Sequence, residues 1–258
     1  MSKSPLNINL VQYDIAWENP ARNLLKLEDL LRDANPADLT ILPEMFTTGF
    51  TMNASAMAEP MTGASVEWMN ETAKMLRGDL LGSLIIEDGS QYFNRLIWMG
   101  PDGIRGTYDK RHLFTMAGED RVYMAGSERV MVQHLGWNCY PFICYDVRFP
   151  VWSRVGNKAE VLIFIANFPD KRADAWSKLL VARAIENQCY VIGVNRIGWD
   201  GEQNYYSGAS VVIDPLGNEI LQMEETQGIG QAALDNVSLE IVRRDMPFLN
   251  DADKFELI

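Results

Sequence analysis

Three side chains whose chemistry fits together stand at the ends of apolar segments. Glu44 follows "LTILP", Lys110 follows "GIRGTYD", and Cys144 follows "YPFI". A thiol is a weak nucleophile until it is deprotonated, and a carboxylate within hydrogen-bond reach takes up such a proton. A nearby ammonium offsets the repulsion between thiolate and carboxylate, and it also stabilises an oxyanion that develops on an attacked carbon. These residue types therefore indicate nucleophilic catalysis by a cysteine, with the backbone N–H of Tyr145 as a second oxyanion donor.

Each of the three residues also has a simpler interpretation. Cys144 is then a small buried hydrophobe, Glu44 pairs with an arginine in a loop, and Lys110 belongs to the solvated charge run "DKRH". All three lie where predicted strands end, however, and open α/β folds bind their ligands outside the carboxyl ends of strands. This shared placement favours one pocket that only the fold can assemble, because the residues are far apart in the sequence.

Composition excludes several classes of protein. The 258 residues carry a net charge of −12, which disfavours nucleic-acid binding because that depends on cationic surfaces. The three cysteines, Cys139, Cys144 and Cys189, form no CxxC pair, so neither a disulfide framework nor a zinc site is expected. No apolar run reaches the length of a signal peptide or a membrane span. We therefore expect a cytoplasmic protein with free thiols, no metal and no membrane association.

The hydrophobic patterns predict alternating strands and helices in both halves of the chain. Leu24, Leu27 and Leu31 recur at helical spacing after Asn19 and Pro20. Residues 80–110 indicate a three-stranded meander with turns at "EDGS" and "GPDG". Further strands are predicted at "LNINLVQYD", "ADLTILPE", "WNCYPFIC", "AEVLIFIAN" and "CYVIGVNR", further helices at residues 65–77, 151–155 and 172–188, and a hairpin around residues 215–218. The pattern favours one α/β domain with two packed sheets and outer helices, but it leaves the strand order open.

Several motifs resemble those of a known enzyme family. The strings "LPEMFTTGF", "YDKRHLF" followed by "AGE", and "CYDVRFP" are similar to the three catalytic motifs of the nitrilase superfamily, the carbon–nitrogen hydrolases. The strings "ANFPDKRADAW" and "ARAIENQCYVIGVNRIG" also resemble that family, and within it the bacterial omega-amidase-like branch. The resemblance extends over residues 6 to 250. Three matching contexts together are specific, whereas any one motif alone is weak.

The resemblance implies a fold and a set of roles. The fold is a four-layer α-β-β-α sandwich of two packed mixed sheets with outer helices. It is expected as one domain over residues 1–258 with its core at about 6–250 and a polar tail from Asp245 on the surface or on a partner. The family commonly forms homodimers or higher homo-oligomers, and it implies no cofactor. Glu44 is implied as general base, Lys110 as oxyanion stabiliser and Cys144 as nucleophile. Glu119 is implied as a supporting glutamate, although "GEDR" is also typical of a surface turn.

The implied activity is that of an amidase. Its substrates would be small carboxylated ω-monoamides such as 2-oxoglutaramate, which it would hydrolyse to the acid and ammonia through a thioester. Nitrile hydrolysis, decarbamoylation and acyl transfer use the same three residues and stay open. A non-catalytic or redox-sensing thiol protein is the alternative of a different class, because a thiolate beside an ammonium is readily oxidised.

Candidate substrate-binding residues surround the motifs. The planar guanidinium of Arg148 suits a substrate carboxylate, or it pairs with Asp146 or another acid to brace the turn. Phe46, Phe168 and Tyr145 are expected as apolar lining, and Trp176 either walls the pocket or belongs to the core. His112 is expected to pack or to form hydrogen bonds. A group of methionines either covers the entrance or lies in a plain surface loop: Met45, Met52, Met57 and Met61.

Overall fold

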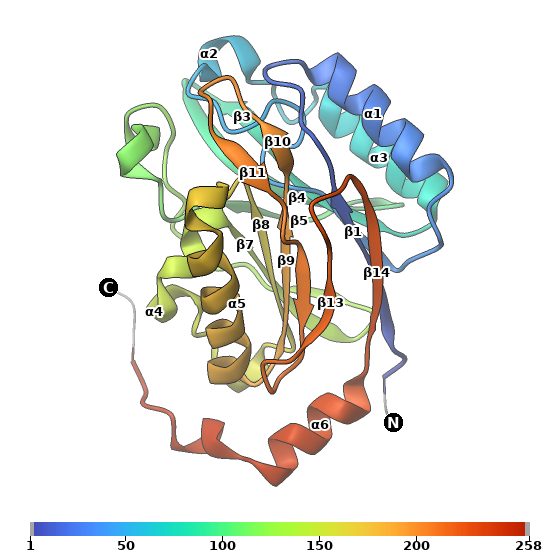
Figure 1. Cartoon of the computed structure of the whole chain (residues 1–258), viewed down its shortest axis with the longest axis vertical. Coiled ribbons are helices and arrows are strands. Elements are labelled where there is room, and N and C mark those ends of the chain that lie inside the picture. Colours follow the sequence, from blue (N-terminus) through green and yellow to red (C-terminus); the bar gives the residue numbers. More distant parts are fainter. Residues whose placement is uncertain (1–2, 256–258) are drawn as a thin grey trace.

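A computed structural model describes residues 3–255, and its centre consists of two six-stranded sheets (Figure 1). The first sheet has the order β14-β1-β2-β3-β4-β5. Its strands are β1 (Leu6–Gln12), β2 (Leu39–Ile41), β3 (Asp79–Asp88), β4 (Gln91–Gly100), β5 (Gly103–Asp109) and β14 (Gly228–Leu234). Strands β1, β2 and β3 are parallel, whereas β3, β4 and β5 form the predicted antiparallel meander. The sheet is therefore mixed.

The second sheet has the order β13-β12-β9-β8-β7-β6 and is also mixed. Its strands are β6 (Val132–His134), β7 (Trp137–Ile143), β8 (Val161–Ala166), β9 (Tyr190–Asn195), β12 (Val211–Ile213) and β13 (Glu219–Gln222). The three central strands β7, β8 and β9 run parallel and are almost wholly apolar, as expected for strands covered on both faces. A separate hairpin pairs β10 (Ile197–Trp199) with β11 (Tyr205–Ser207).

Helices cover the outer face of each sheet. In Figure 1, α1 (Pro20–Arg32) and α3 (Ala64–Leu76) lie together beside the first sheet, and α5 (Ala173–Asn187) lies with the short α4 (Pro150–Ser153) beside the second. Helix α1 begins where the sequence predicts, because Pro20 fits the first turn and the Asn19 side chain accepts a hydrogen bond from Arg22 N at 3.1 Å. Strand β1 contacts β9 and β4 contacts β7, so the two sheets pack face to face. The predicted four-layer α-β-β-α fold is confirmed.

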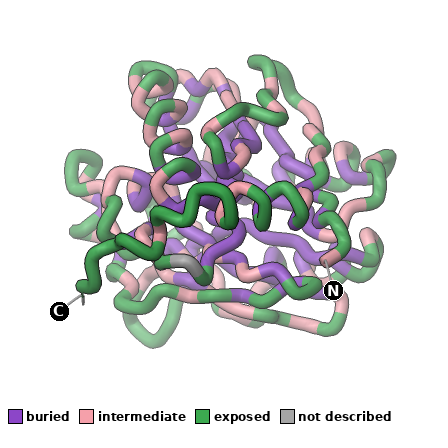
Figure 2. Tube along the Cα trace, turned by 90° about the horizontal axis from the view of Figure 1, so that it is seen from below, coloured by how far each residue is buried: buried purple, intermediate pink, exposed green. Residues whose placement is uncertain are grey.

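Three elements near the C-terminus were not predicted. Strand β14 pairs antiparallel with β1, and helix α6 (Asn236–Asp245) follows it with the Asp235 side chain as N-cap. The hairpin of β10 and β11 was also missed. Figure 2 shows the largely exposed C-terminal segment crossing the face of the molecule that is seen from below. The expected surface tail from Asp245 onward includes a 3₁₀ turn at Phe248–Asp251, and its last three residues, 256–258, lie outside the described residues.

The remaining short elements lie in the connecting loops. Helix α2 (Ala54–Met57) precedes α3, and 3₁₀ turns occur at Thr115–Ala117, Glu119–Arg121, Cys144–Arg148, Gly156–Lys158 and Asp170–Arg172. Within residues 3–255, no helix is both long and apolar enough to cross a bilayer.

Candidate active site

The fold brings Glu44, Lys110 and Cys144 to one end of the sandwich. Glu44 follows β2, Lys110 directly follows β5, and Cys144 directly follows β7. The Lys110 ammonium lies 2.9 Å from a carboxylate oxygen of Glu44, and both side chains are 0% exposed. The Cys144 thiol donates to Asn167 O at 3.8 Å, and the Glu44 carboxylate lies close enough for its negative charge to raise the pKa of the thiol. The first sheet therefore supplies the acid and the ammonium, and the second sheet supplies the sulfur.

Four hydrogen bonds fix Glu44. Its Oε1 accepts from Lys110 Nζ at 2.9 Å and from Asn94 Nδ2 at 2.8 Å. Its Oε2 accepts from the backbone N–H of Asn167 at 2.7 Å, and its backbone carbonyl accepts from Asn167 Nδ2 at 2.6 Å. The carboxylate is thus held in one orientation beside the thiol.

Glu119 is part of the same buried cluster and not a surface turn. Both of its carboxylate oxygens bind Lys110 Nζ, at 2.9 and 3.0 Å, and the Phe114 N–H donates to one of them. Burial raises the pKa of Glu119; the positive charge of Lys110 opposes this shift and the negative charge of Glu44 adds to it. Asn94 Nδ2 lies 3.5 Å from Glu119 Oε1, so one amide faces both carboxylates.

Cys144 occupies a strained backbone position at the start of a 3₁₀ turn. Its φ is +46°, a left-handed conformation that costs an ordinary residue about 1–2 kcal/mol. The buried Asp146 carboxylate stabilises the turn, because Oδ2 accepts from Ile143 N at 3.0 Å and from the Tyr108 hydroxyl at 2.7 Å. Its Oδ1 lies 3.0 Å from His112 N and 2.7 Å from His112 Nδ1. The turn places the thiol beyond the end of β7, beside residues of the first sheet.

The electrostatics keep the resting thiol protonated. Burial raises the pKa of Cys144 well above its ordinary value, the charge of Glu44 raises it further, and Lys110 opposes both. For Lys110, burial disfavours the ammonium, yet the neighbouring Glu119 and Glu44 carboxylates raise its pKa above the ordinary value. The cluster thus holds a permanent cation, two acids and a neutral nucleophile next to a proton acceptor.

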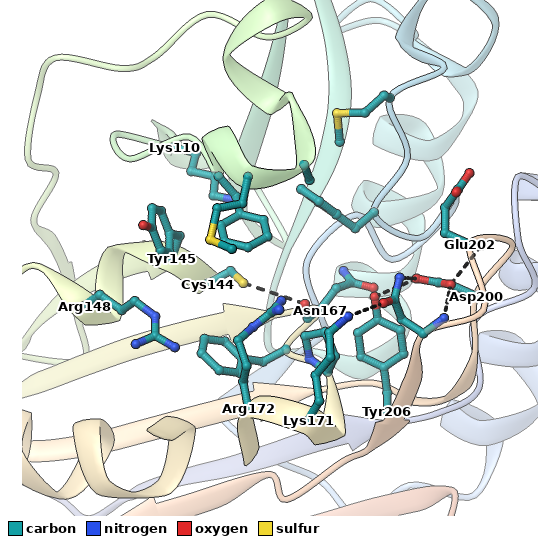
Figure 3. Close-up of a pocket in the computed structure, with 18 of the residues that line it drawn as sticks. Lys110, Cys144, Tyr145, Arg148, Asn167, Lys171, Arg172, Asp200, Glu202 and Tyr206 are labelled. Carbon is teal, nitrogen blue, oxygen red and sulfur yellow. Dashed lines mark hydrogen bonds between the residues drawn. The ribbon is translucent and has the colours of Figure 1, made fainter. Parts of the chain in front are cut away.

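A cavity of about 530 Å³ opens onto these groups (Figure 3). Lys110, Cys144 and Asn167 line it, and Phe114, Tyr145 and Phe168 form apolar parts of its wall. Besides Lys110, its charged lining residues are Arg148, Lys171, Arg172, Asp200 and Glu202. A small amide fits such a space, with its reacting carbon near the sulfur and a polar end near the charged wall.

Of the four residues expected to bind substrate, Arg148 and Phe168 line the cavity, but Phe46 and Trp176 do not. Phe46 is buried under α3 and packs against Trp68, with ring centroids 5.9 Å apart. Trp176 lies behind the wall: its ring is 5.2 Å from that of Phe168, and its Nε1 donates to Ala209 O at 3.1 Å. Both expectations are corrected, because residue type predicts burial but not which side of a packed layer a ring faces.

The structure excludes the pairing of Arg148 with Asp146. The two oxygens of Asp146 accept from Ile143, Tyr108 and His112, not from Arg148. The Arg148 guanidinium instead lies over the Phe168 ring, with Cζ 5.5 Å from the centroid. His112 stacks on Phe149 with centroids 3.7 Å apart, so its packing and hydrogen-bonding role is as expected.

The methionines divide between the core and the entrance. Met45 is fully buried, and Met57 and Met61 pack against core residues, so only Met52 of the four lines the cavity. Met116 also lines it and is 82% exposed.

Sequence reasoning missed Asn94 and Asn167. Asn94 lies inside a strand of the meander, where a buried amide among apolar neighbours is the only signal. Asn167 directly follows β8, a strand-end position like that of Cys144. Among the described residues, no three His, Cys, Asp or Glu side chains are grouped so as to hold a metal ion.

A family model and individual relatives identify the same protein family for this chain. The family model for carbon–nitrogen hydrolase matches residues 7–244. The sequence is 41% identical over 256 residues to the omega-amidase YafV of Yersinia enterocolitica, covering 99% of this chain and 100% of that protein. It is 34% identical over 253 residues to a 2-oxoglutaramate amidase of Bacillus subtilis, covering 96% of this chain and 97% of the relative.

A solved structure agrees closely with the fold. It is that of XC1258 from Xanthomonas campestris, described as a CN-hydrolase superfamily protein with an arsenic adduct in the active site. The two structures align with a TM-score of 0.96 at 41% identity, covering 98% of this chain and 99% of the other. On its sequence and its fold, this chain belongs to the carbon–nitrogen hydrolase family.

Proposed function

We propose that this hydrolase is an ω-amidase that cleaves the terminal amide of small ω-monoamides of dicarboxylic acids, such as 2-oxoglutaramate. The observation that carries the proposal is the buried ion pair of Glu44 and Lys110 beside Cys144, at a cavity whose wall also presents arginine side chains. The names of the relatives from Yersinia enterocolitica and Bacillus subtilis support the same substrate class.

In the acylation half-reaction, Cys144 Sγ attacks the amide carbon while Glu44 takes the thiol proton. The amide oxygen becomes an oxyanion, which the Lys110 ammonium and the Tyr145 N–H stabilise; loss of one such donor typically costs about 10²–10³ in rate. When the C–N bond breaks, Glu44 returns the proton to the leaving nitrogen. Ammonia departs and the acyl group remains on sulfur as a thioester.

In the deacylation half-reaction, Glu44 removes a proton from water as the water oxygen attacks the thioester carbon. The tetrahedral intermediate collapses, the C–S bond breaks, and the proton returns from Glu44 to sulfur. Glu119 is a supporting residue, because its two contacts with Lys110 Nζ hold the ammonium beside Glu44. Acid, ammonia and the protonated thiol are the products.

An ω-monoamide carries a free carboxylate, and Arg148 is our candidate to bind it. The guanidinium lines the cavity and lies over the Phe168 ring, so its N–H groups are left for a ligand. The chain has a net charge of −12, so attraction of an anionic substrate must come from such local cations.

Ammonia release from four compounds tests the reaction: 2-oxoglutaramate, succinamate, an aliphatic nitrile and an N-carbamoyl amino acid. Release from either monoamide, lost in Cys144→Ala, supports the ω-amidase. Activity confined to the nitrile or the carbamoyl compound instead supports a nitrilase or carbamoylase using the same residues. No release from either monoamide refutes the ω-amidase assignment.

Mass spectrometry separates an enzyme from a redox-sensing thiol protein. An amidase gives a substrate-dependent mass gain on Cys144 equal to the acyl group, absent in Cys144→Ala. A sensor gives only sulfenic acid or a mixed disulfide after oxidant treatment. The buried contacts of Glu44 and Lys110 favour the enzyme, since a sensor needs neither a fixed base nor an oxyanion site.

We further propose a single-domain cytoplasmic enzyme that forms a homodimer or a higher homo-oligomer. Apolar side chains of α6 and the segment after it are exposed, among them Val237, Ile241, Met246 and Phe248. Exposed apolar clusters of this kind are typical of protein interfaces. Light scattering after size-exclusion chromatography measures the mass against the 29.2 kDa monomer, and cell fractionation tests the compartment.

A further inference from the structure

We propose that Arg172 is a second carboxylate-binding residue, which acts with Arg148 and makes the site selective for carboxylated amides. The inference rests on the proposed function, because it concerns the end of the substrate remote from Cys144.

Neighbouring strands place the two arginines on one side of the cavity. Arg148 ends the 3₁₀ turn that follows β7, and Arg172 ends the one that follows β8. Because β7 and β8 are adjacent and parallel, both turns lie at the same edge of the second sheet. The Phe168 ring is 5.5 Å from Arg148 Cζ and 5.8 Å from Arg172 Cζ, so the two guanidinium groups share one aromatic side chain. Arg172 Cζ is also 4.9 Å from the Phe114 centroid.

The two guanidinium groups have no acidic counterpart within residues 3–255. Neither takes part in an ion pair or a hydrogen bond there, and their contacts are with aromatic rings. Both are half-buried, so water screens their mutual repulsion only in part. An anion bound between them would relieve that repulsion.

The acids of the cavity are already engaged or lie elsewhere. Figure 3 shows Asp200 and Glu202 on the far side of Asn167 from Arg148. Asp200 accepts hydrogen bonds from the Tyr206 hydroxyl at 2.8 Å and from Asn204 N at 2.8 Å, among others. The neighbouring cation Lys171 donates to Asn204 Oδ1 at 2.8 Å. Lys171 keeps its charge but is bonded toward Asn204, so Arg148 and Arg172 are the cavity cations that have no hydrogen-bond partner among the described residues.

The geometry suits a carboxylate. A guanidinium held by a cation–π contact with an aromatic ring keeps its N–H groups free to donate. A carboxylate has two oxygens with four acceptor sites, so it can bind two arginines at once. An amide that ends in a methyl group would leave both guanidinium groups without an anion. We therefore expect it to bind more weakly than a carboxylated amide.

Kinetics with a matched pair of substrates test this. Succinamate carries the carboxylate, whereas butyramide has a methyl group at that position. We expect Arg172→Gln to lower kcat/KM for succinamate about 10- to 100-fold, mainly through KM, because a hydrogen bond to a charged group is lost. The value for butyramide should change less than about threefold. Arg172→Lys, which keeps the charge without the fork, should lie between.

Lys171→Met is the control, since it removes an adjacent cation that is bonded to Asn204. It should leave the ratio of succinamate to butyramide activity unchanged. An equal loss on both substrates in Arg172→Gln, or no loss on either, would overturn the proposal. Thermal unfolding of each variant shows whether it folds. If Arg172→Gln does not fold, the kinetics of Arg172→Lys test the proposal in its place.

A binding measurement separates this inference from the ω-amidase proposal. Titration calorimetry of succinate into Cys144→Ala requires no hydrolysis. The added change Arg172→Gln should weaken succinate binding about 10- to 100-fold, and Lys171→Met should not. Unchanged affinity, or no succinate binding to Cys144→Ala, refutes the role of Arg172. Failure of the wild type to release ammonia from the monoamides refutes the ω-amidase instead.

Discussion

The Lys110 ammonium lies 2.9 Å from Glu44 Oε1 although 66 positions separate the two residues. The same ammonium lies 2.9 Å from Glu119 Oε1, so one positive charge serves two carboxylates. Ionisation of the Cys144 thiol would add further negative charge to a buried cluster. Under the proposed mechanism we therefore expect the proton to leave sulfur only as the sulfur attacks, with Glu44 as its acceptor.

The first prediction concerns the ionisation of the thiol. Burial and the charge of Glu44 raise the pKa of Cys144, so the reactive thiolate is scarce at neutral pH and grows as pH rises toward that pKa. The rate of iodoacetamide alkylation at Cys144, followed by mass spectrometry, should therefore keep rising beyond about pH 8.5, the ordinary pKa of a cysteine. Cys144→Ala corrects for the other thiols. A plateau reached near neutral pH would contradict the protonated resting state.

The second prediction concerns Asn94, whose amide binds Glu44 Oε1 at 2.8 Å. Asn94→Leu removes a hydrogen bond to a charged group, worth about 1.5–3 kcal/mol, so kcat/KM should fall roughly 10- to 100-fold. Ammonia release measures the effect.

The control for Asn94 is Asn187→Leu. Asn187 is equally buried and its amide donates to Arg183 O at 3.0 Å, but it lies at the far end of α5. Asn187→Leu should lower the free energy of unfolding but keep kcat/KM within about threefold of the wild-type value. Equal kinetic effects of the two variants would mean that Asn94 acts only through folding.

The third prediction concerns the turn that carries the nucleophile. Asp146→Asn replaces an acceptor of four hydrogen bonds by an amide, whose N–H₂ group would face donors. The free energy of unfolding should fall by about 2–3 kcal/mol and kcat should fall with it, because the φ of +46° at Cys144 loses its support. Urea unfolding and ammonia release measure the two effects.

Asp214→Asn is the matched control in solvent. Asp214 accepts from Leu216 N at 2.8 Å and from Asn218 N at 2.9 Å in the exposed turn between β12 and β13. Because water replaces lost bonds there, the change should cost less than about 1 kcal/mol. If Asp214→Asn lowers the free energy of unfolding as much as Asp146→Asn does, then burial is not the reason for the effect at Asp146.

The fourth prediction is a pH dependence of stability from Asp79 at the start of β3. Burial alone would raise the pKa of Asp79, but hydrogen bonds from His134, Trp98 and Arg105 outweigh it and lower that pKa. A lowered carboxyl pKa gives stability that is present above the unfolded value of about 3.9 and is lost as pH falls through the folded value.

Urea unfolding of the wild type and Asp79→Asn from neutral to acidic pH checks this. The difference in unfolding free energy should be constant above about pH 5 and should shrink below about pH 4. A difference that grows on acidification would reverse the sign and contradict the assignment.

The sequence predicted those elements whose pattern is local. The leucines of α1, the turns of the meander and the apolar runs of β8 and β9 each carry their structure within a few residues. Strand β14 was missed because "GIGQAAL" is poor in strand-forming residues, and its conformation depends on pairing with β1 at the other end of the chain. The hairpin of β10 and β11 likewise has only short segments.

The candidate site was predictable where chemistry and strand ends coincide. Glu44, Lys110 and Cys144 each follow a predicted strand, so their meeting followed from the fold class. Asn94 and Arg172 have no such signal, because an amide inside a strand and an arginine in a charged turn are ordinary in sequence. The errors at Phe46 and Trp176 have a related cause: the direction of an aromatic ring depends on tertiary packing.

The pairing of β1 with β14 has a consequence for synthesis of the protein. Leu6 pairs with Leu234 and Gln12 with Gly228, so this edge of β1 has no partner until residues 228–234 have been synthesised. Until the ribosome releases those residues, the nascent chain keeps an open strand edge that can join other chains. We therefore expect refolding to be limited by the meeting of β1 and β14, because this pairing closes a loop that spans most of the chain.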